Sequence, residues 1–336
     1  MTAAPPLLSR HVTAAGARIY TLSVQAFTGL RVNVFVLVVG DPARPTYTAL
    51  VDTGSSLNSS IQGLADLRAI REDWGENASW AQLDRVVITH AHPDHAGGLP
   101  FVRTLTGAPV AAHRAGLPIL QDPRGYREAM RAPLARYRAW LGVPESSDYA
   151  VRLTNRASNL MLPSGVTVDT VLEDGVLVDG VLRVIHTPGH EGSQVCLQLD
   201  DVLLSADHLL PRNSPPLMPE WLHAGGGLRH YLRSLDRVEA LEGVGIALGG
   251  HDEPMPEWRG RIRQLRERYD TKLRAVLDAA ATPITVHDLA HRVNRMNPKQ
   301  ALLLLDQTAA LTEYLSAGGQ LRETEGPDGA ALFVRA

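Results

Sequence analysis

The chain has 336 residues and a formal net charge of −3 at pH 7, so it has room for one large α/β domain and a smaller second one but no general affinity for polyanions. Its single cysteine, Cys196, excludes internal disulfides and a cysteine-built zinc site. Residues 1–10 lack the basic-then-apolar pattern of a secretory signal, and no apolar run reaches the ~20 residues of a membrane helix. We therefore expect a cytoplasmic protein without a membrane partner.

Strands and helices are predicted to alternate along most of the chain. Short β-rich segments between Gly and Pro turns predict strands, and apolar residues at helical spacing predict helices. The predicted strands are Ile19–Ala26, Val32–Val39, Tyr47–Val51, Arg85–Thr89, Pro109–Ala112, Val166–Leu172, Val181–His186, Gln194–Leu199, Val202–Ser205 and Val244–Leu248; the helices are Ile61–Trp74, His95–Thr104 and Leu228–Leu241. Two segments depart from this alternation. One is Leu117–Pro163, which has a predicted helix over Tyr126–Leu141 and is typical of an insertion. The other is Pro211–Gly227, which is typical of a mobile loop.

The C-terminal part has the outline of a winged-helix module. Its predicted elements are helices over Glu257–Ala281, from Pro283 to about Asn294 and over Lys299–Ser316, then two strands within Leu321–Val334. Such modules often bind nucleic acid. Here the charge of residues 259–336 is nearly balanced and Ala301–Ala310 is almost wholly apolar. These features favour packing or a homodimer contact over DNA binding.

A metal site is predicted where an apolar strand ends. Four metal-capable side chains, His90, His92, Asp94 and His95, fall within six residues directly after Arg85–Thr89. Three imidazoles and a carboxylate at this density repel one another and leave polar groups unused unless they bind something. Neutral imidazoles and a carboxylate suit zinc, iron or manganese.

Three further ligand candidates lie far away in the sequence, also at strand ends. His190, Asp207 and His251 each follow a predicted strand and a residue pattern that turns the chain tightly. An α/β scaffold gathers such loops at one edge to build a site. We therefore expect these three side chains to meet the first cluster.

The pattern His-x-His-x-Asp-His with downstream His, Asp and His resembles the metallo-β-lactamase superfamily in its binuclear hydrolase branch, over residues 15–258. The resemblance implies an α/β fold, an αββα sandwich of two mixed sheets, with two divalent metal ions at one edge. Zinc is the first choice of metal, with manganese or iron as alternatives. By the same resemblance His90, His92 and His190 would hold one ion, Asp94, His95 and His251 the other, and Asp207 would bridge them.

The resemblance also implies a division of the chain and a hydrolytic mechanism. A catalytic domain would span residues 1–258, with an insertion at about 117–163, and residues 259–336 resemble the winged-helix tail of lactamase-B-like proteins. Two divalent ions that share a water lower its pKa toward neutrality and yield a bridging hydroxide. Asp207 as the bridge and Asp94 as the proton carrier are then the candidate catalytic residues.

One motif invites another interpretation. Leu50–Ser55 matches the aspartic-protease signature, but that chemistry needs a second such loop and the chain has only one. The resemblance instead gives Asp52 the role of supporting the metal-ligand loops from behind.

The substrate stays open at this point among three classes. A thioester or ester comes first, as in hydroxyacylglutathione hydrolases or acyl-thioesterases, because residues 117–163 could cover a small acyl substrate. The residues after Gly250-His251 lack the Glu-Tyr-Thr of glutathione-thioester enzymes. A single-strand endoribonuclease and a lactonase are the alternatives, and a non-enzymatic binding module comes last; nucleic acid is disfavoured because no aromatic-plus-basic strip is evident. The candidate substrate contacts are His208, Arg229, His230 and Tyr231.

Overall fold

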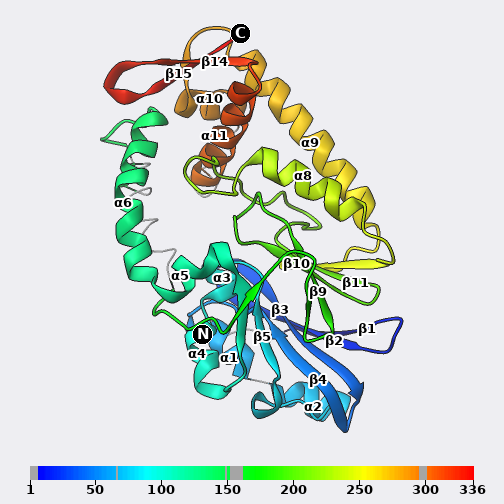
Figure 1. The fold of residues 1–336 in the computed structure, drawn as a ribbon. Coiled ribbons are helices and arrows are strands. Elements are labelled where there is room, and N and C mark those ends of the chain that lie inside the picture. The colour runs from blue at the N-terminus through cyan, green and yellow to red at the C-terminus, as the bar shows by residue number, and fades with distance from the viewer. Residues whose placement is uncertain (1–6, 66, 148–149, 152–161, 295–300) are drawn as a thin grey trace.

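Two mixed β-sheets pack face to face, with helices on their outer sides (Figure 1). The computed structural model describes residues 7–65, 67–147, 150–151, 162–294 and 301–336. The predicted αββα sandwich is confirmed. Within these ranges no helix combines the length and apolar character that crossing a membrane requires.

The first sheet has seven strands in chain order, antiparallel from β1 to β4 and parallel from β4 to β7. One face of β2 is almost continuously buried, as expected from its alternating apolar residues. Its strands are β1 (Leu7–Val12), β2 (Arg18–Phe27), β3 (Leu30–Asp41), β4 (Arg44–Val51), β5 (Arg85–Ile88), β6 (Val110–His113) and β7 (Thr170–Leu172).

The second sheet has five strands in the order β12-β11-β10-β9-β8. A buried cluster joins its inner face to that of the first sheet, with Phe35 and Leu37 on one side and Leu197 and Leu204 on the other. Its strands are β8 (Leu177–Val178), β9 (Leu182–His186), β10 (Val195–Leu199), β11 (Val202–Ala206) and β12 (Ile246–Gly249). Burial of this apolar surface between the sheets stabilises the sandwich.

Helices cover both outer faces. Beside the first sheet lie α1 (Asn58–Ala65), α2 (Leu67–Trp74), α3 (Pro93–Ala96), α4 (Leu99–Leu105) and α5 (Leu117–Gln121). Helix α6 (Pro123–Trp140) of the insertion continues from α5 toward the C-terminal elements (Figure 1) and packs with them. The remaining elements are α8 (Leu228–Glu239), α9 (Trp258–Ala279), β13 (Ile284–Thr285), α10 (Val286–Val293), α11 (Ala301–Ala317), β14 (Leu321–Glu325) and β15 (Ala331–Arg335). Helices α8 and α9 share a buried cluster with the outer face of the second sheet.

Several predicted boundaries were wrong, for local reasons. The predicted helix His95–Thr104 is broken at Gly97 and Gly98, because the backbone there passes close to other chain segments: a Cβ on Gly98 would lie 2.0 Å from the Thr53 carbonyl oxygen. Of Val166–Leu172, only the last three residues form a strand. The short strands β1 and β8 were not predicted, and residue 66 of the predicted helix Ile61–Trp74 lies outside the described residues.

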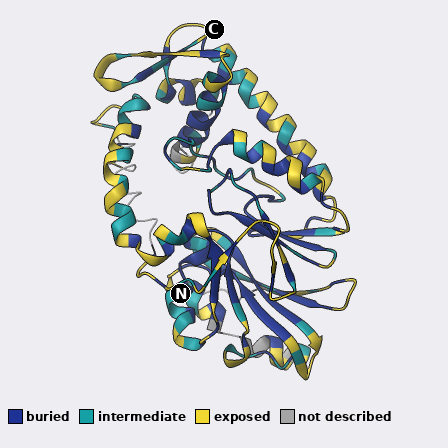
Figure 2. Cartoon of the chain, viewed as in Figure 1, coloured by how far each residue is buried: buried dark blue, intermediate teal, exposed yellow. Residues whose placement is uncertain are grey.

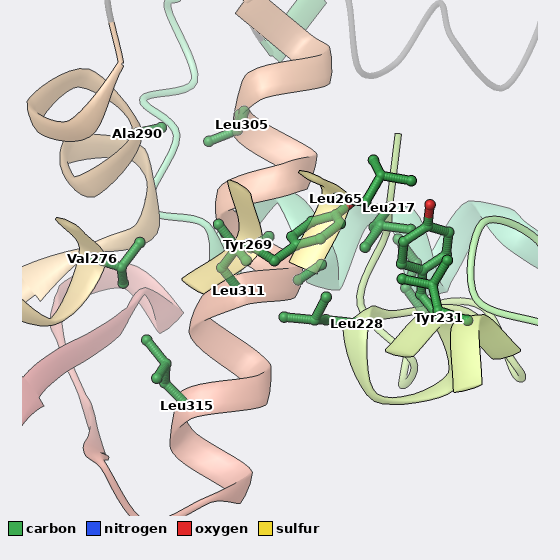
Figure 3. Close-up of a cluster of buried hydrophobic side chains, with 14 of the residues drawn as sticks. Leu217, Leu228, Tyr231, Leu265, Tyr269, Val276, Ala290, Leu305, Leu311 and Leu315 are labelled. Atoms are coloured by element: carbon green, nitrogen blue, oxygen red, sulfur yellow. The ribbon is translucent and has the colours of Figure 1, made fainter. Parts of the chain in front are cut away.

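The C-terminal elements share one core with the second sheet. A single buried cluster contains Tyr137 of α6, Leu203 of β11, Tyr269 of α9 and Leu311 of α11. Figure 3 shows the part of this cluster around Tyr269 and Leu311. Helix α11 is therefore mostly buried by its own chain (Figure 2), which accounts for its apolar sequence without a second copy. The predicted order of three helices and a hairpin is present; its assignment as a winged helix and the domain division at 258/259 stay predictions.

The packing of α11 makes a testable prediction. Leu311→Ala is expected to lower the free energy of unfolding by about 2–5 kcal/mol, because it removes a side chain that is 2% exposed and leaves a cavity. Denaturant unfolding would measure the change. Leu303→Ala on the same helix is the control, since Leu303 is 46% exposed and its loss should change stability by only about 0.5 kcal/mol. Equal effects of the two substitutions would contradict this packing.

Candidate metal centre

All seven predicted metal ligands converge at one edge of the sandwich. The first four lie on the loop after β5 and on α3, while His190 lies between β9 and β10. Asp207 directly follows β11, and His251 lies two residues beyond β12. Ligand atoms lie within 4.8 Å of one another in three overlapping groups: His90, His92 and His190; His90, His95 and Asp207; Asp94, His95 and His251.

Asp207 lies at the centre of the cluster. Its Oδ1 is 3.3 Å from His95 Nε2, and its Oδ2 is 3.6 Å from His190 Nε2 and 3.3 Å from His251 Nε2. On the other side His90 Nε2 and His92 Nδ1 lie 3.1 Å apart. The Asp207 carboxylate thus reaches both halves of the cluster, as a bridging ligand must.

Backbone and carboxylate oxygens fix the orientation of the imidazole rings. In three histidines Nδ1 faces an acceptor: Asp52 Oδ2 at 2.8 Å from His95, the Pro216 carbonyl at 2.7 Å from His190, and the Arg31 carbonyl at 2.5 Å from His251. Such an acceptor keeps a proton on Nδ1, so Nε2 presents its lone pair to a metal. The surrounding chain therefore prepares these rings for ligation.

Asp52 ties two strand ends to the cluster. Its carboxylate accepts hydrogen bonds from the Thr89 backbone N–H and hydroxyl, both at 2.8 Å, as well as from His95. The Thr89 hydroxyl also lies 3.1 Å from His90 Nδ1. Asp52 is fully buried and has φ +62°, a left-handed conformation that Asp adopts more readily than bulky residues. Its position at the end of β4 is the one expected of a residue that supports the ligand loops.

Two histidines are kept neutral by their surroundings. Burial, with smaller effects from neighbouring histidines, lowers the pKa of His90 well below its ordinary value. Burial also lowers the pKa of His92 to about 3, assisted by the charge of His190. Neutral imidazoles are the form that binds a metal.

The carboxylates have the opposite effect on the other half of the cluster. Although burial opposes it, the charge of Asp207 raises the pKa of His251 to about 10 and that of His95 well above its ordinary value. Burial likewise opposes ionisation of Asp94, but His95 and His251 lower its pKa to about 2. Two negative carboxylates are thus held among cations, and a metal ion would replace the protons of His95 and His251.

The donor set fits a pair of divalent metal ions. His95 Nε2, His190 Nε2 and Asp207 Oδ1 are buried and make no hydrogen bond within the described part of the chain. Gly250 leaves room beside them, since a Cβ there would lie 2.5 Å from Asp207 Oδ1. Buried polar atoms without partners are costly, and nitrogen and oxygen donors without thiolates suit zinc, manganese or iron.

The structure places two of the four predicted substrate contacts in the interior. Tyr231 and His208 are completely buried, and the Tyr231 hydroxyl donates to the His208 carbonyl at 2.9 Å. Tyr231 lies on the inward face of amphipathic α8, so it packs in the core instead of lining a pocket. His230 pairs with Glu220 at 2.9 Å and Arg229 is exposed; for all four residues the substrate role stays a prediction.

One residue of the insertion that interacts with the neighbourhood of His190 was not predicted. Tyr126, in the first turn of α6, has its hydroxyl 3.4 Å from His223 Nδ1. Burial raises its pKa to about 12, and the charge of Glu191, the residue after His190, adds to the effect. The insertion therefore comes near the loop that carries His190. The sequence located the insertion but not the side of its helix that faces inward.

Comparisons with known proteins agree with this geometry. The metallo-β-lactamase superfamily model matches residues 27–251. The probable metallo-hydrolase YqjP of Bacillus subtilis (strain 168) is 25% identical over 296 residues, which cover 84% of this chain and 88% of that protein.

Two solved structures are similar over nearly the whole chain. The metallo-β-lactamase family protein TTHA1429 from Thermus thermophilus is 26% identical with a TM-score of 0.73, and covers 95% of this chain and 98% of its own. A β-lactamase domain protein from Burkholderia ambifaria is 23% identical with a TM-score of 0.76, and the match covers 98% of this chain and 94% of that protein. The shared fold thus extends past residue 251 into the C-terminal elements. The chain belongs to the metallo-β-lactamase superfamily and is a hydrolase of that fold.

Proposed function

We propose that this hydrolase binds two divalent metal ions and cleaves a small thioester or ester. The convergence of seven nitrogen and oxygen ligands around Asp207 supports the metal pair. In this proposal His90, His92 and His190 would hold one ion, Asp94, His95 and His251 would hold the other, and Asp207 would be a ligand shared by the two.

The chain's own groups supply proton transfer around these ions. When bound, the ions provide a nucleophile at neutral pH and stabilise negative charge that develops on the substrate. Asp94 has the more accessible carboxylate, with a side chain 14% exposed compared with 8% for Asp207. Its Oδ2 lies 3.5 Å from His251 Nε2, at the edge of the cluster, and is the atom to which we assign accepting a proton and passing it to the leaving group.

The surroundings of the centre favour a small acyl substrate. Tyr126 of α6 lies near the loop that carries His190, and its phenol stays protonated at neutral pH and is therefore a hydrogen-bond donor. Three arginines of α9 make contacts within the chain: Arg261 donates to the Leu210 carbonyl, Arg259 to the Leu241 carbonyl, and Arg266 pairs with Glu239. These contacts support an acyl substrate over RNA.

Metal removal and replacement test the proposal. Chelation is expected to abolish release of free thiol from acyl-coenzyme A or acyl-glutathione, and addition of zinc, manganese or iron to restore it, because the ions supply the nucleophile. Thiol release would be followed spectroscopically beside the metal content per chain. Lactone and single-stranded RNA substrates, run in parallel, distinguish the alternatives. Metal-dependent RNA cleavage without thiol release would replace the proposed substrate, and a chain that takes up no metal would contradict the metal pair.

A further inference from the structure

The loop of residues 210–227 connects Asp207 to α8 and sets the position of His190. Its Pro216 carbonyl accepts the hydrogen bond from His190 Nδ1 at 2.7 Å. At its other end Gly227 N–H donates to the Gly189 carbonyl at 2.9 Å, one residue before His190. A shift of this loop would therefore turn or displace the His190 ring.

Side chains of the C-terminal helices hold this loop on both sides of Pro216. Arg261 of α9 donates to the Leu210 carbonyl at 2.7 Å and to the Asn213 carbonyl at 2.9 Å. Glu313 of α11 accepts the N–H groups of residues 220 and 221 at 2.8 and 3.2 Å, one on each carboxylate oxygen. Backbone groups of an irregular segment need partners from elsewhere, and these two side chains supply four of them.

Apolar contacts fix the same segment. Leu217, the residue after Pro216, is fully buried in the cluster that contains Leu265 of α9 and Leu311 of α11 (Figure 3). Leu222 is also buried there. The sequence predicted a mobile loop over Pro211–Gly227; in the structure this segment is joined to the C-terminal helices by these contacts. Neither Arg261 nor Glu313 contacts the metal ligands, so any effect they have on the centre must pass through the loop.

We propose that the C-terminal helices serve as a support for the metal centre, in which Arg261 and Glu313 are positioning residues that orient His190 through residues 210–227. This inference rests on the proposed metal pair, because it assigns the support to the ion held by His90, His92 and His190. Residues that orient a ligand from behind typically change metal affinity 10–100-fold. The C-terminal region then has a function in the hydrolase itself, without any nucleic-acid partner.

Glu313→Gln is the sharpest test, because glutamine keeps the size of the side chain but can accept only one of the two N–H groups. Glu313 lines a cavity of about 600 Å³ with Trp140 and Trp221, so glutamine fits without overpacking. In a zinc titration against a competing chelator, we expect about a 10–100-fold weaker affinity for one of two ions and an unchanged affinity for the other. Glu325→Gln, on exposed β14 of the same region, is the matched control and should change neither.

The His190→Ala background separates positioning from general destabilisation. That variant should retain only the ion of Asp94, His95 and His251, and adding Glu313→Gln should then leave the affinity for this remaining ion unchanged. A further loss in the double variant, or equal weakening of both ions in the single variant, would overturn the proposal.

Hydrogen exchange of the metal-free chain gives a measurement that does not depend on metal binding. Glu313→Gln is expected to speed exchange of the amides in residues 210–227 while those of α9 stay unchanged, and Arg261→Lys, which loses the paired donors, should act on the same segment. Unchanged exchange in both variants would overturn the support even if zinc binds normally. A wild-type chain that binds no zinc would instead contradict the proposed metal pair, whatever the exchange of the variants.

Discussion

Asp207→Ala is expected to lower kcat/KM for metal-dependent hydrolysis by about a thousandfold or more, since several kcal/mol of stabilisation by the metal pair depend on this carboxylate. Asp207 is the carboxylate that reaches both halves of the cluster, with three histidine Nε2 atoms between 3.3 and 3.6 Å away. Its removal also leaves the protonated forms of His95 and His251 without their main counter-charge. Steady-state kinetics and metal analysis of the purified variant would measure both losses.

Two further variants test whether the loss is due to the charge of Asp207. Asp207→Asn keeps the shape and one acceptor oxygen but removes the charge, so we expect most of the loss to persist. Asp201→Ala changes a carboxylate at the opposite end of β11, beyond Val202, and should leave hydrolysis unchanged. Full activity of either Asp207 variant would contradict the bridging role.

Much of the metal centre was predictable because topology decides it. His190, Asp207 and His251 each follow a strand of the second sheet, and loops at one edge of a sheet meet whatever their separation in sequence. The ring-orienting acceptors on Arg31 and Pro216 were not predictable, because a backbone carbonyl is present in every residue. Only the folded path of the chain determines which carbonyl lies behind which histidine.

The predicted substrate contacts and the packing of the C-terminal helices show a different limit of prediction from sequence. Tyr231 follows the loop after Asp207, so its sequence position suggested a pocket, but the apolar spacing of Leu228, Tyr231 and Leu235 places it in the core. For helix α11 the sequence leaves open which surface covers its apolar residues. An apolar helix must be covered, and sequence alone does not say whether its own chain or a second copy covers it.

Asp52→Ala is expected to affect both folding and metal binding. The fully buried carboxylate accepts two hydrogen bonds from Thr89 and one from His95. Removing one partner of a buried charged network costs about 3–5 kcal/mol, and alanine is also strained at φ +62°. Denaturant unfolding of the metal-free chain should show this loss. A chelator titration should show about a 10–100-fold weaker zinc affinity, since the His95 ring loses its orienting acceptor.

Asp52→Asn separates the two effects, because asparagine adopts the left-handed conformation readily and keeps the size of the side chain. Its amide oxygen can still accept from the Thr89 backbone N–H, but the amide N–H₂ group then faces His95 Nδ1 and the Thr89 hydroxyl. We therefore expect a smaller loss of stability than with alanine and a similar loss of zinc affinity. If asparagine retained wild-type zinc affinity, His95 would not depend on a negative acceptor, and the role of Asp52 would be confined to joining the ends of β4 and β5.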